Sequence, residues 1–348
     1  ASRPVADQDL WAQQADNRRK SVWLVAGFIV FFAWLGFGGD WVYYLYTQHL
    51  PATQYHHVVP WFGIVMTLVG VGLCRYAWHD GAGRVLWATG AQEVIDPVTD
   101  KEKVLVNVVE EMAIAASIPR PRVWIVPDPD PNAFATGNDP ATASIAVTEG
   151  LLDTLDRDEL QAVVAHEMAH VRNLDVRLMT LLAAIVGAVA LMSQGAGRWL
   201  GFGGGGRGRD NEGKGAGPLG VVVLVLWIVS LILAPLVTRL LAMAVSRKRE
   251  FLADATGAQL TRNPMALASA LTKLDAATAP TRAITSGAAH LCIVDPAGSA
   301  INDREGAAAD FLGSHPPTRV RIARLRGMGY QQMKREGVPL PDAGAGAA

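Results

Sequence analysis

DRDELQAVVAHEMAH, the stretch from Asp156 to His170, is the most informative part of this sequence. Asp156 followed three residues later by Glu159 is the pattern of a capping box, so a helix is expected to begin there. On that helix His166 and His170 lie one turn apart on the same face, where both imidazoles can bind a single Zn²⁺. The stretch therefore predicts a helix that carries two ligands of a metal site.

Glu167 directly follows the first histidine, which completes the arrangement HExxH. Its carboxylate would adjoin the metal without binding it and could accept a proton from water held there. The residues before the motif, Val163, Val164 and Ala165, are apolar. Burying two imidazoles among them costs free energy unless the imidazoles gain a compensating interaction such as a bond to metal. We therefore favour a zinc site over the alternative, two surface histidines on an ordinary helix.

The third metal ligand must come from another element, and Glu250 is the best candidate. In SRKREFLAD, residues 246–254, Glu250 and Asp254 again have i, i+4 spacing, so one carboxylate can bind metal while the other orients a ligand histidine. Glu250 lies 80 residues after His170, and removing the 61 apolar-hairpin residues 178–238 leaves 19. The alternative is a solvated, charged helix face beside the three basic residues that precede Glu250.

Four stretches without charged residues are long enough, or nearly so, to cross a bilayer as helices, which takes about 20 residues. They comprise 19, 17, 20 and 24 residues and are 21–39, 58–74, 178–197 and 215–238. A buried core helix is an alternative for any one of them. Together they predict a multi-pass membrane protein with two hairpins.

The charges beside the first stretch predict its orientation. Arg18, Arg19 and Lys20 precede it, whereas no basic residue lies between Asp40 and His57, so the positive-inside tendency places the N-terminus in the cytoplasm. Two hairpins then leave both large aqueous segments on that same side. The second hairpin contains a glycine-rich loop with four basic residues, which leaves open whether it crosses completely.

The aqueous segments have the pattern of an α+β, mainly helical domain with a small antiparallel sheet. Strands are expected at 122–126, 132–136 and 144–148, with a turn at 137–140 between the last two. Besides the helix of the HExxH motif, helices are expected at 101–117, 248–260, 264–275 and 317–335.

The composition excludes several other classes of protein. Of the 348 residues, 50% are hydrophobic and 18% charged, and the net charge of −1 provides no basic field for nucleic acid. The two cysteines lie 218 positions apart, which excludes a disulfide framework and a cysteine zinc ribbon. A match to GxGxxG at 201–206 follows no strand, so neither nucleic acid nor nucleotide is an expected partner.

Three motifs, in this order, resemble the HtpX-like membrane zinc metalloproteases, which are relatives of the CAAX prenyl proteases within the gluzincin clan. The motifs are HEMAHVRNLD, SRKREFLADA and SHPPTRVRIARL, and the resemblance covers roughly residues 15–330. It implies a gluzincin-like protease domain that faces the cytoplasm. It also implies one Zn²⁺ per chain held by His166, His170 and Glu250, with Glu167 as the general base.

The same resemblance assigns further residues around the zinc. Asp254 falls on the family's aspartate behind a ligand histidine, and His315 and Arg321 fall on its SHPP motif and the following arginine. We expect His315, supported by Arg321, to donate to the oxyanion formed during hydrolysis; the alternative is a turn that opens the last helix. The segment NAFATG matches the stretch that lines the substrate cleft, so extended substrate is expected along Asn132, Ala133, Phe134, Ala135 and Thr136.

We therefore predict a zinc-dependent endopeptidase that hydrolyses membrane or misfolded proteins at the cytoplasmic face of a bacterial inner membrane, in protein quality control. The expected partners are protein or peptide substrates and the lipid bilayer. Two alternatives stay open: a CAAX-type prenyl-peptide protease and a non-catalytic zinc-binding scaffold. The expected organisation is a cytoplasmic segment (1–20), a first transmembrane hairpin (21–74), the first part of the protease domain (75–177), a second hairpin (178–238), the second part of the domain (239–335) and a disordered tail (336–348).

Overall fold

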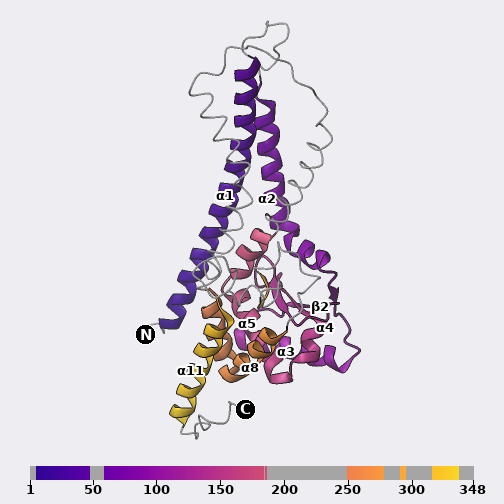
Figure 1. Ribbon diagram of the computed structural model, residues 1–348, viewed down its shortest axis with the longest axis vertical. Coiled ribbons are helices and arrows are strands. Elements are labelled where there is room, and N and C mark those ends of the chain that lie inside the picture. The colour runs from indigo at the N-terminus through magenta and orange to yellow at the C-terminus, as the bar shows by residue number, and fades with distance from the viewer. Residues whose placement is uncertain are drawn as a thin grey trace.

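Two long helices rise from a body of helices and strands in the computed structural model of the chain (Figure 1). Helix α1 (Val5–Thr47) and helix α2 (Trp61–Ala88) lie side by side, and the N-terminal part of α1 runs down beside the body. The structure describes residues 5–47, 59–183, 185, 249–277, 291–294 and 316–336.

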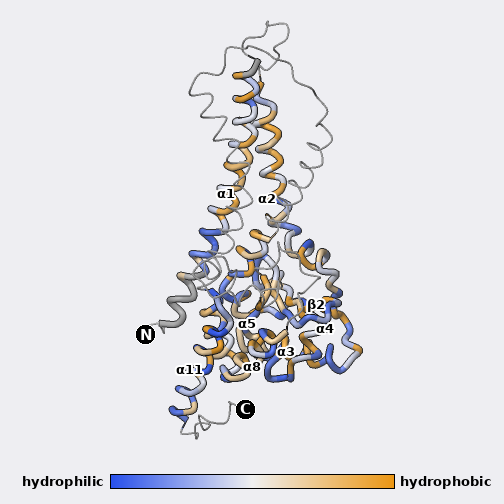
Figure 2. Tube along the Cα trace, in the orientation of Figure 1, coloured by the Kyte–Doolittle hydropathy of each residue, from blue (hydrophilic) through white to orange (hydrophobic). Residues whose placement is uncertain are grey.

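Helices α1 and α2 are both long and apolar enough to cross a membrane. The candidate spans are Gln14–Leu45 and Trp61–Ala88, and Figure 2 shows hydrophobic residues along the part of each helix that rises above the body. Many of these side chains point outward: Trp23 is 68% exposed, Phe62 67% and Leu68 65%. Because water would penalise so much outward apolar surface, these faces fit a lipid environment.

The two helices are joined closely at the end that lies away from the body. The buried carboxylate of Asp40 accepts hydrogen bonds from the backbone N–H groups of Phe62 and Gly63, at 3.3 and 2.6 Å, and so caps the start of α2. One turn earlier, a Cβ on Gly36 would lie 2.6 Å from the carbonyl oxygen of Phe62. The helix backbones can approach this closely only because Gly36 has no side chain.

The second predicted hairpin, 178–238, falls mostly outside the described residues. Its first residues, 178–183, are helical, and Ile185 packs in a cluster with Phe28, Phe32 and Cys74 from α1 and α2. The start of the third predicted span therefore lies against the first helical pair. The tail 336–348 also falls outside the described residues, apart from Glu336.

The helices of the body occur close to where the sequence predicts them. Helix α5 begins with the expected capping box, in which Asp156 and Glu159 bond each other's backbone N–H at 2.9 and 3.0 Å. The helix that carries Glu250 comprises residues 249–261. Helix α5 comprises Arg157–Arg172, and the other predicted helices are α3 (Asp100–Ala116), α8 (Pro264–Ala276) and α11 (Thr318–Glu336). The short helix α4 (Glu149–Thr154) was not predicted from the sequence.

The sheet is mixed, so the prediction of an antiparallel sheet was wrong. Its order is β1-β2-β4-β3, with β2 parallel to β4 and the other two pairs antiparallel. The prolines at positions 127, 129 and 131 disfavour a tight hairpin after β2, and the chain passes over one strand position before β3. Strand β4 fills that position. The strands are β1 (Gln92–Glu93), β2 (Arg122–Val126), β3 (Ala133–Thr136) and β4 (Ser144–Thr148).

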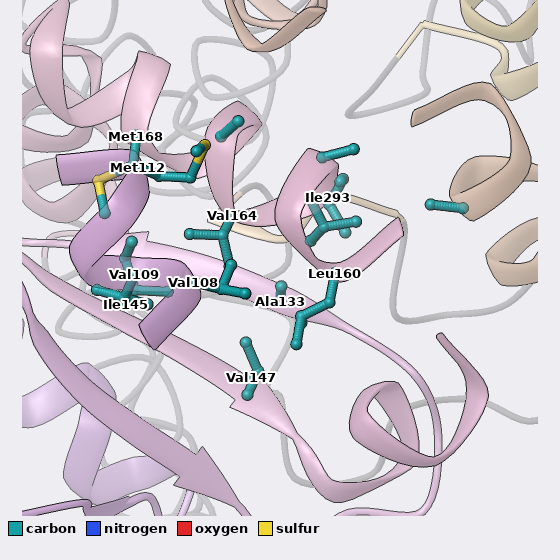
Figure 3. Packing of buried hydrophobic residues seen from close by; sticks show 14 of the residues in the cluster. Val108, Val109, Met112, Ala133, Ile145, Val147, Leu160, Val164, Met168 and Ile293 are labelled. Atoms are coloured by element: carbon teal, nitrogen blue, oxygen red, sulfur yellow. The ribbon is translucent and has the colours of Figure 1, made fainter. Parts of the chain in front are cut away.

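The main core lies between the sheet and the helices α3, α5 and α8. Figure 3 shows Val108 and Met112 of α3 and Ile145 of β4 beside Val164 and Met168 of α5. All of these side chains are at most 5% exposed. Helix α5 is thus packed on several sides by apolar groups, which fixes the position of its motif in the middle of the body.

The glycine contact between α1 and α2 can be tested in the full chain. Gly36→Ala should lower the melting temperature, because the new methyl group meets backbone atoms of α2, and such overpacking costs about 1–3 kcal/mol. Gly27→Ala is the matched control, since a Cβ there meets nothing within 4 Å. Thermal unfolding in detergent measures both variants. Equal melting temperatures would show that the helices do not need this close approach.

Candidate active site

Three predicted metal ligands converge at the centre of the body. One ligand atom from each of His166, His170 and Glu250 lies within 4.8 Å of the other two, and all three residues are buried. The two histidine Nε2 atoms are 3.3 Å apart, and Glu250 oxygens lie 3.6 and 3.5 Å from them. Tetrahedral zinc with bonds of about 2.0–2.1 Å would hold its ligand atoms about 3.3 Å apart, so this arrangement fits the ion.

The backbone explains how a residue 80 positions from His170 reaches this centre. Residues 249–261 form a helix that crosses α5 at very short distance: a Cβ on Gly257 would lie 3.0 Å from the backbone nitrogen of His166. A larger residue would push the two helices apart. The crossing places Glu250, two turns before Gly257, opposite the histidines of α5.

Each candidate histidine ligand has a carboxylate behind it. Nδ1 of His166 lies 3.0 Å from Asp254, the residue expected to orient a ligand histidine, and Nδ1 of His170 lies 3.3 Å from Asp175. A proton on Nδ1 that faces a carboxylate leaves Nε2 free to bind metal. Burial opposes the charged form of His170, but its contacts with Asp175 and Glu250 outweigh this and raise its pKa to about 10 in the metal-free chain.

Asp175 is a site residue that the sequence reasoning missed. It is wholly buried and follows Leu174, whose φ of 59° reverses the chain just after α5 ends. The sequence contains one signal for it: a carboxylate five residues after His170, within the motif HEMAHVRNLD. Helical spacing alone could not place it near the ring of His170, because the turn lies between them.

Arg321 provides a buried positive charge beside these carboxylates. Its Nε and Nη2 donate to both oxygens of Asp254 at 2.9 and 2.7 Å, and its Nη1 donates to the carbonyl oxygen of Ile293 at 2.8 Å. Nη1 also lies 3.4 Å from Glu250. Burial alone would raise the pKa of Asp254, but the guanidinium outweighs this and lowers it to about 2.

Glu167 has the environment of a group available for proton transfer. It is 1% exposed, and neither of its carboxylate oxygens makes a hydrogen bond within the described part of the chain. Burial raises the pKa of this carboxyl above its usual value, although the neighbouring histidines oppose the change. Burying a carboxylate without a hydrogen bond lowers the stability of the folded state. Its position next to the three ligand atoms therefore indicates a catalytic function.

The predicted substrate strand, Asn132–Thr136, lies beside α5 and is buried throughout. One edge of β3 pairs with β4, while part of the other edge contacts residues 291–294 of the chain itself. The carbonyl of Ala133 accepts from the N–H of Ile293 at 3.0 Å, and Asn132 donates to the carbonyl of Val294 at 3.2 Å. An extended substrate would have to pair farther along β3 or displace this segment.

His315 lies outside the described residues, so its predicted contact with an oxyanion stays a prediction. The structure does place its proposed supporter, Arg321, against Asp254 and not at the surface of the terminal helix. The bonds to Asp254 link α11 to the candidate metal centre through the aspartate behind His166.

An HExxH helix that faces a glutamate on a second helix is the arrangement of a zinc metalloprotease site. Residues 99–329 match peptidase family M48, and the chain belongs to this family. The predicted resemblance is thereby confirmed, and the chain is a metalloprotease, a hydrolase.

Known relatives cover nearly the whole chain. A "Protease HtpX homolog" of Caldanaerobacter subterraneus subsp. tengcongensis is 37% identical over 329 residues, which is 93% of this chain and 99% of the relative. A homologue of the same name from Streptococcus agalactiae serotype III is 43% identical over 320 residues, 92% of this chain and all of the relative. The crystal structure of S. mikatae Ste24p aligns with a TM-score of 0.42 and 16% identity, over 91% of this chain and 66% of that one.

The contact between Arg321 and Asp254 generates a prediction for stability. Arg321→Lys cannot keep the paired bonds to Asp254 and the bond to Ile293, so it should lower the free energy of unfolding by about 3 kcal/mol or more. Chemical unfolding in detergent measures this loss. Arg326→Lys, an exposed position on the same helix, is the control. If both variants unfolded alike, the buried pair would not hold α11 in place.

Proposed function

We propose that this chain is a zinc-dependent endopeptidase that cleaves peptide bonds in membrane or misfolded proteins. The observation that carries the proposal is the convergence of His166, His170 and Glu250 at zinc-ligand separations. Beside them lies the carboxylate of Glu167, which has no hydrogen bond to any residue that the structure describes. We assign the three residues as zinc ligands and Glu167 as the general base. Family membership supports a metalloprotease, and the donor set of two imidazoles and one carboxylate is one that zinc uses in catalytic sites.

When bound, zinc supplies Lewis-acid chemistry, which makes water acidic and polarises a carbonyl. Glu167 accepts the proton of the attacking water and later donates it to the leaving amine. Asp254 and Asp175 hold the ligand histidines in the tautomer that directs Nε2 inward. No residue of the chain becomes covalently attached to substrate in this mechanism.

We propose an extended substrate beside β3, held mainly by main-chain hydrogen bonds. Such binding makes little use of side chains and suits damaged proteins of varied sequence. Because residues 291–294 already bond to Asn132 and Ala133, the substrate pairs with β3 toward Thr136 or displaces those residues. His315, with Arg321 behind the centre, is proposed to donate to the oxyanion.

We further propose that the protease body lies at the cytoplasmic face of a bacterial inner membrane, in a protein with four spans. Three basic residues before the first span support this orientation. The outward apolar surface of α1 and α2 supports the membrane placement. Removal of misfolded membrane proteins is the function that this location favours.

Two substitutions separate the chemistry from metal binding. Glu167→Gln should keep about one zinc per chain but lose hydrolysis by several orders of magnitude, because the ligands remain and the base is absent. Glu250→Ala should lose most of its zinc at moderate chelator concentration. Zinc analysis and cleavage of a protein substrate measure the two effects.

Three results would contradict these assignments. Equal zinc loss in both variants would remove the separate functions of Glu167 and Glu250. A zinc-loaded wild-type chain without hydrolysis would favour the scaffold alternative. Cleavage restricted to prenylated peptides would favour the CAAX-type alternative.

The proposed orientation can be tested by cysteine labelling. Leu45→Cys should react with a membrane-impermeant thiol reagent applied to intact cells, whereas Asp100→Cys should react only after lysis. The two native cysteines are buried, so background labelling should be low. Labelling of position 100 but not of position 45 in intact cells would invert the proposed topology.

A further inference from the structure

The side chain of Asn17, on helix α1, contacts Asp175, the carboxylate beside the candidate metal ligand His170. It is 2% exposed, and its Nδ2 donates to the carbonyl of Asn173 at 3.0 Å and to Asp175 Oδ1 at 2.7 Å. The sequence separation of Asn17 and Asp175 is 158 residues. Asn17 also lies outside the segment 99–329 that matches the family. The helix that leads into the membrane therefore touches a residue of the site.

The contact continues to a candidate zinc ligand in one further step. Asp175 uses Oδ1 for Asn17 and directs Oδ2 at Nδ1 of His170, 3.3 Å away. The opposite ring nitrogen of His170 is the atom that lies 3.3 Å from His166 Nε2, at the metal position. Fixing one oxygen of a carboxylate also fixes the direction of the other, because both belong to one planar group. Asn17 thereby sets how Asp175 faces His170.

The chemistry of an amide suits this position. Asp175 is wholly buried, and a guanidinium nitrogen of Arg249 lies 3.5 Å from its Oδ1. A buried carboxylate needs donors, and the amide of Asn17 supplies a short hydrogen bond without adding another charge. An aspartate at position 17 would instead set two carboxylates against each other.

Neighbouring residues of α1 show that attachment of the helix does not by itself require this contact. Gln14 Nε2 donates to the carbonyl of Arg172 at 2.7 Å, which holds α1 against the end of α5 without reaching Asp175. Ser21 is as buried as Asn17, but its hydroxyl donates only to the backbone of its own helix. Among these three residues, Asn17 is the one whose bond leads to the site.

We infer that Asn17 is a positioning residue of the metal centre, through which α1 fixes Asp175 and thereby the ring of His170. This inference rests on the proposed function, since it assigns Asn17 to the zinc site named there. The first membrane helix, α1, is therefore part of the zinc site.

Zinc release from the full-length, zinc-loaded chain tests the inference without measuring activity. Residues that orient metal ligands change metal affinity by about 10–100-fold, so Asp175→Ala should release zinc to a chelating dye at least about 10-fold faster. Asn17→Leu, one contact farther away and similar in volume, should accelerate release about 3- to 10-fold. The controls Ser21→Ala and Gln14→Ala should release zinc at the wild-type rate.

A second measurement separates positioning from general destabilisation. In the Asp175→Ala background, Asn17→Leu should add no further acceleration, because its effect passes through Asp175. Cobalt-substituted Asn17→Leu should also show a shifted visible absorption spectrum, since the geometry of the ligands changes. If Asn17 only attached α1 to the body, Asn17→Leu would lower the melting temperature of the zinc-free chain. The rate of zinc release and the cobalt spectrum would then stay unchanged.

Each outcome decides between these assignments. If the wild-type chain retains no zinc, the proposed function fails first. If the wild-type and Asp175→Ala chains behave as expected but Asn17→Leu releases zinc at the wild-type rate, the inference on Asn17 alone is overturned. Additive acceleration in the double variant would overturn it too. Should Asn17→Leu fail to fold, Asn17→Ser, whose shorter side chain cannot bond both acceptors, is judged by the same rates.

Discussion

The carboxylates at the centre of this protein depend on the guanidinium of Arg321. Glu167, Glu250 and Asp254 lie buried within the same small volume, and burial of so many carboxylates requires a compensating positive charge. Arg321 supplies it by bonding Asp254 with two nitrogens and lying 3.4 Å from Glu250. Two other parts of the body hold this guanidinium. Helix α11 packs against residues 249–261, and the carbonyl oxygen of Ile293 accepts a hydrogen bond from Arg321.

The crossing of the two ligand-bearing helices explains how a long segment of chain can separate His170 from Glu250 in the sequence. The two ligand-bearing helices meet at Gly257, and this crossing needs no particular connection between them. The segment between Ala183 and residue 249 therefore separates the two helices in sequence but not in space. Helix α5, which carries the two histidines, packs against α3, α8 and the sheet.

Local patterns in the sequence predict much of the fold and most of the candidate site. Spacing along the sequence can reveal residues that share a single helix. This applies to the capping box and the i, i+4 histidines of α5, and to the i, i+4 pair Glu250 and Asp254 on the helix 249–261. The parallel pairing of β2 with β4 could not be predicted this way, because it depends on which strand fills the middle of the sheet. The contacts of Arg321 with Asp254 and of Asn17 with Asp175 join distant parts of the chain, and no period in the sequence encodes them.

In the proposed membrane placement, helix α1 also sets the distance between the candidate site and the bilayer. Its 43 residues extend about 65 Å without a break, roughly twice the thickness of the hydrocarbon layer. Asn17 contacts Asp175 four residues before Ser21, the first residue of the predicted membrane stretch 21–39, a distance of about 6 Å along the helix axis. It lies near the start of the candidate span Gln14–Leu45. In the proposed membrane placement, α1 therefore holds the candidate site close to the lipid surface. In that placement, a peptide bond just outside a membrane span lies near the site, whereas a peptide bond in a distant soluble domain must first be brought to the bilayer.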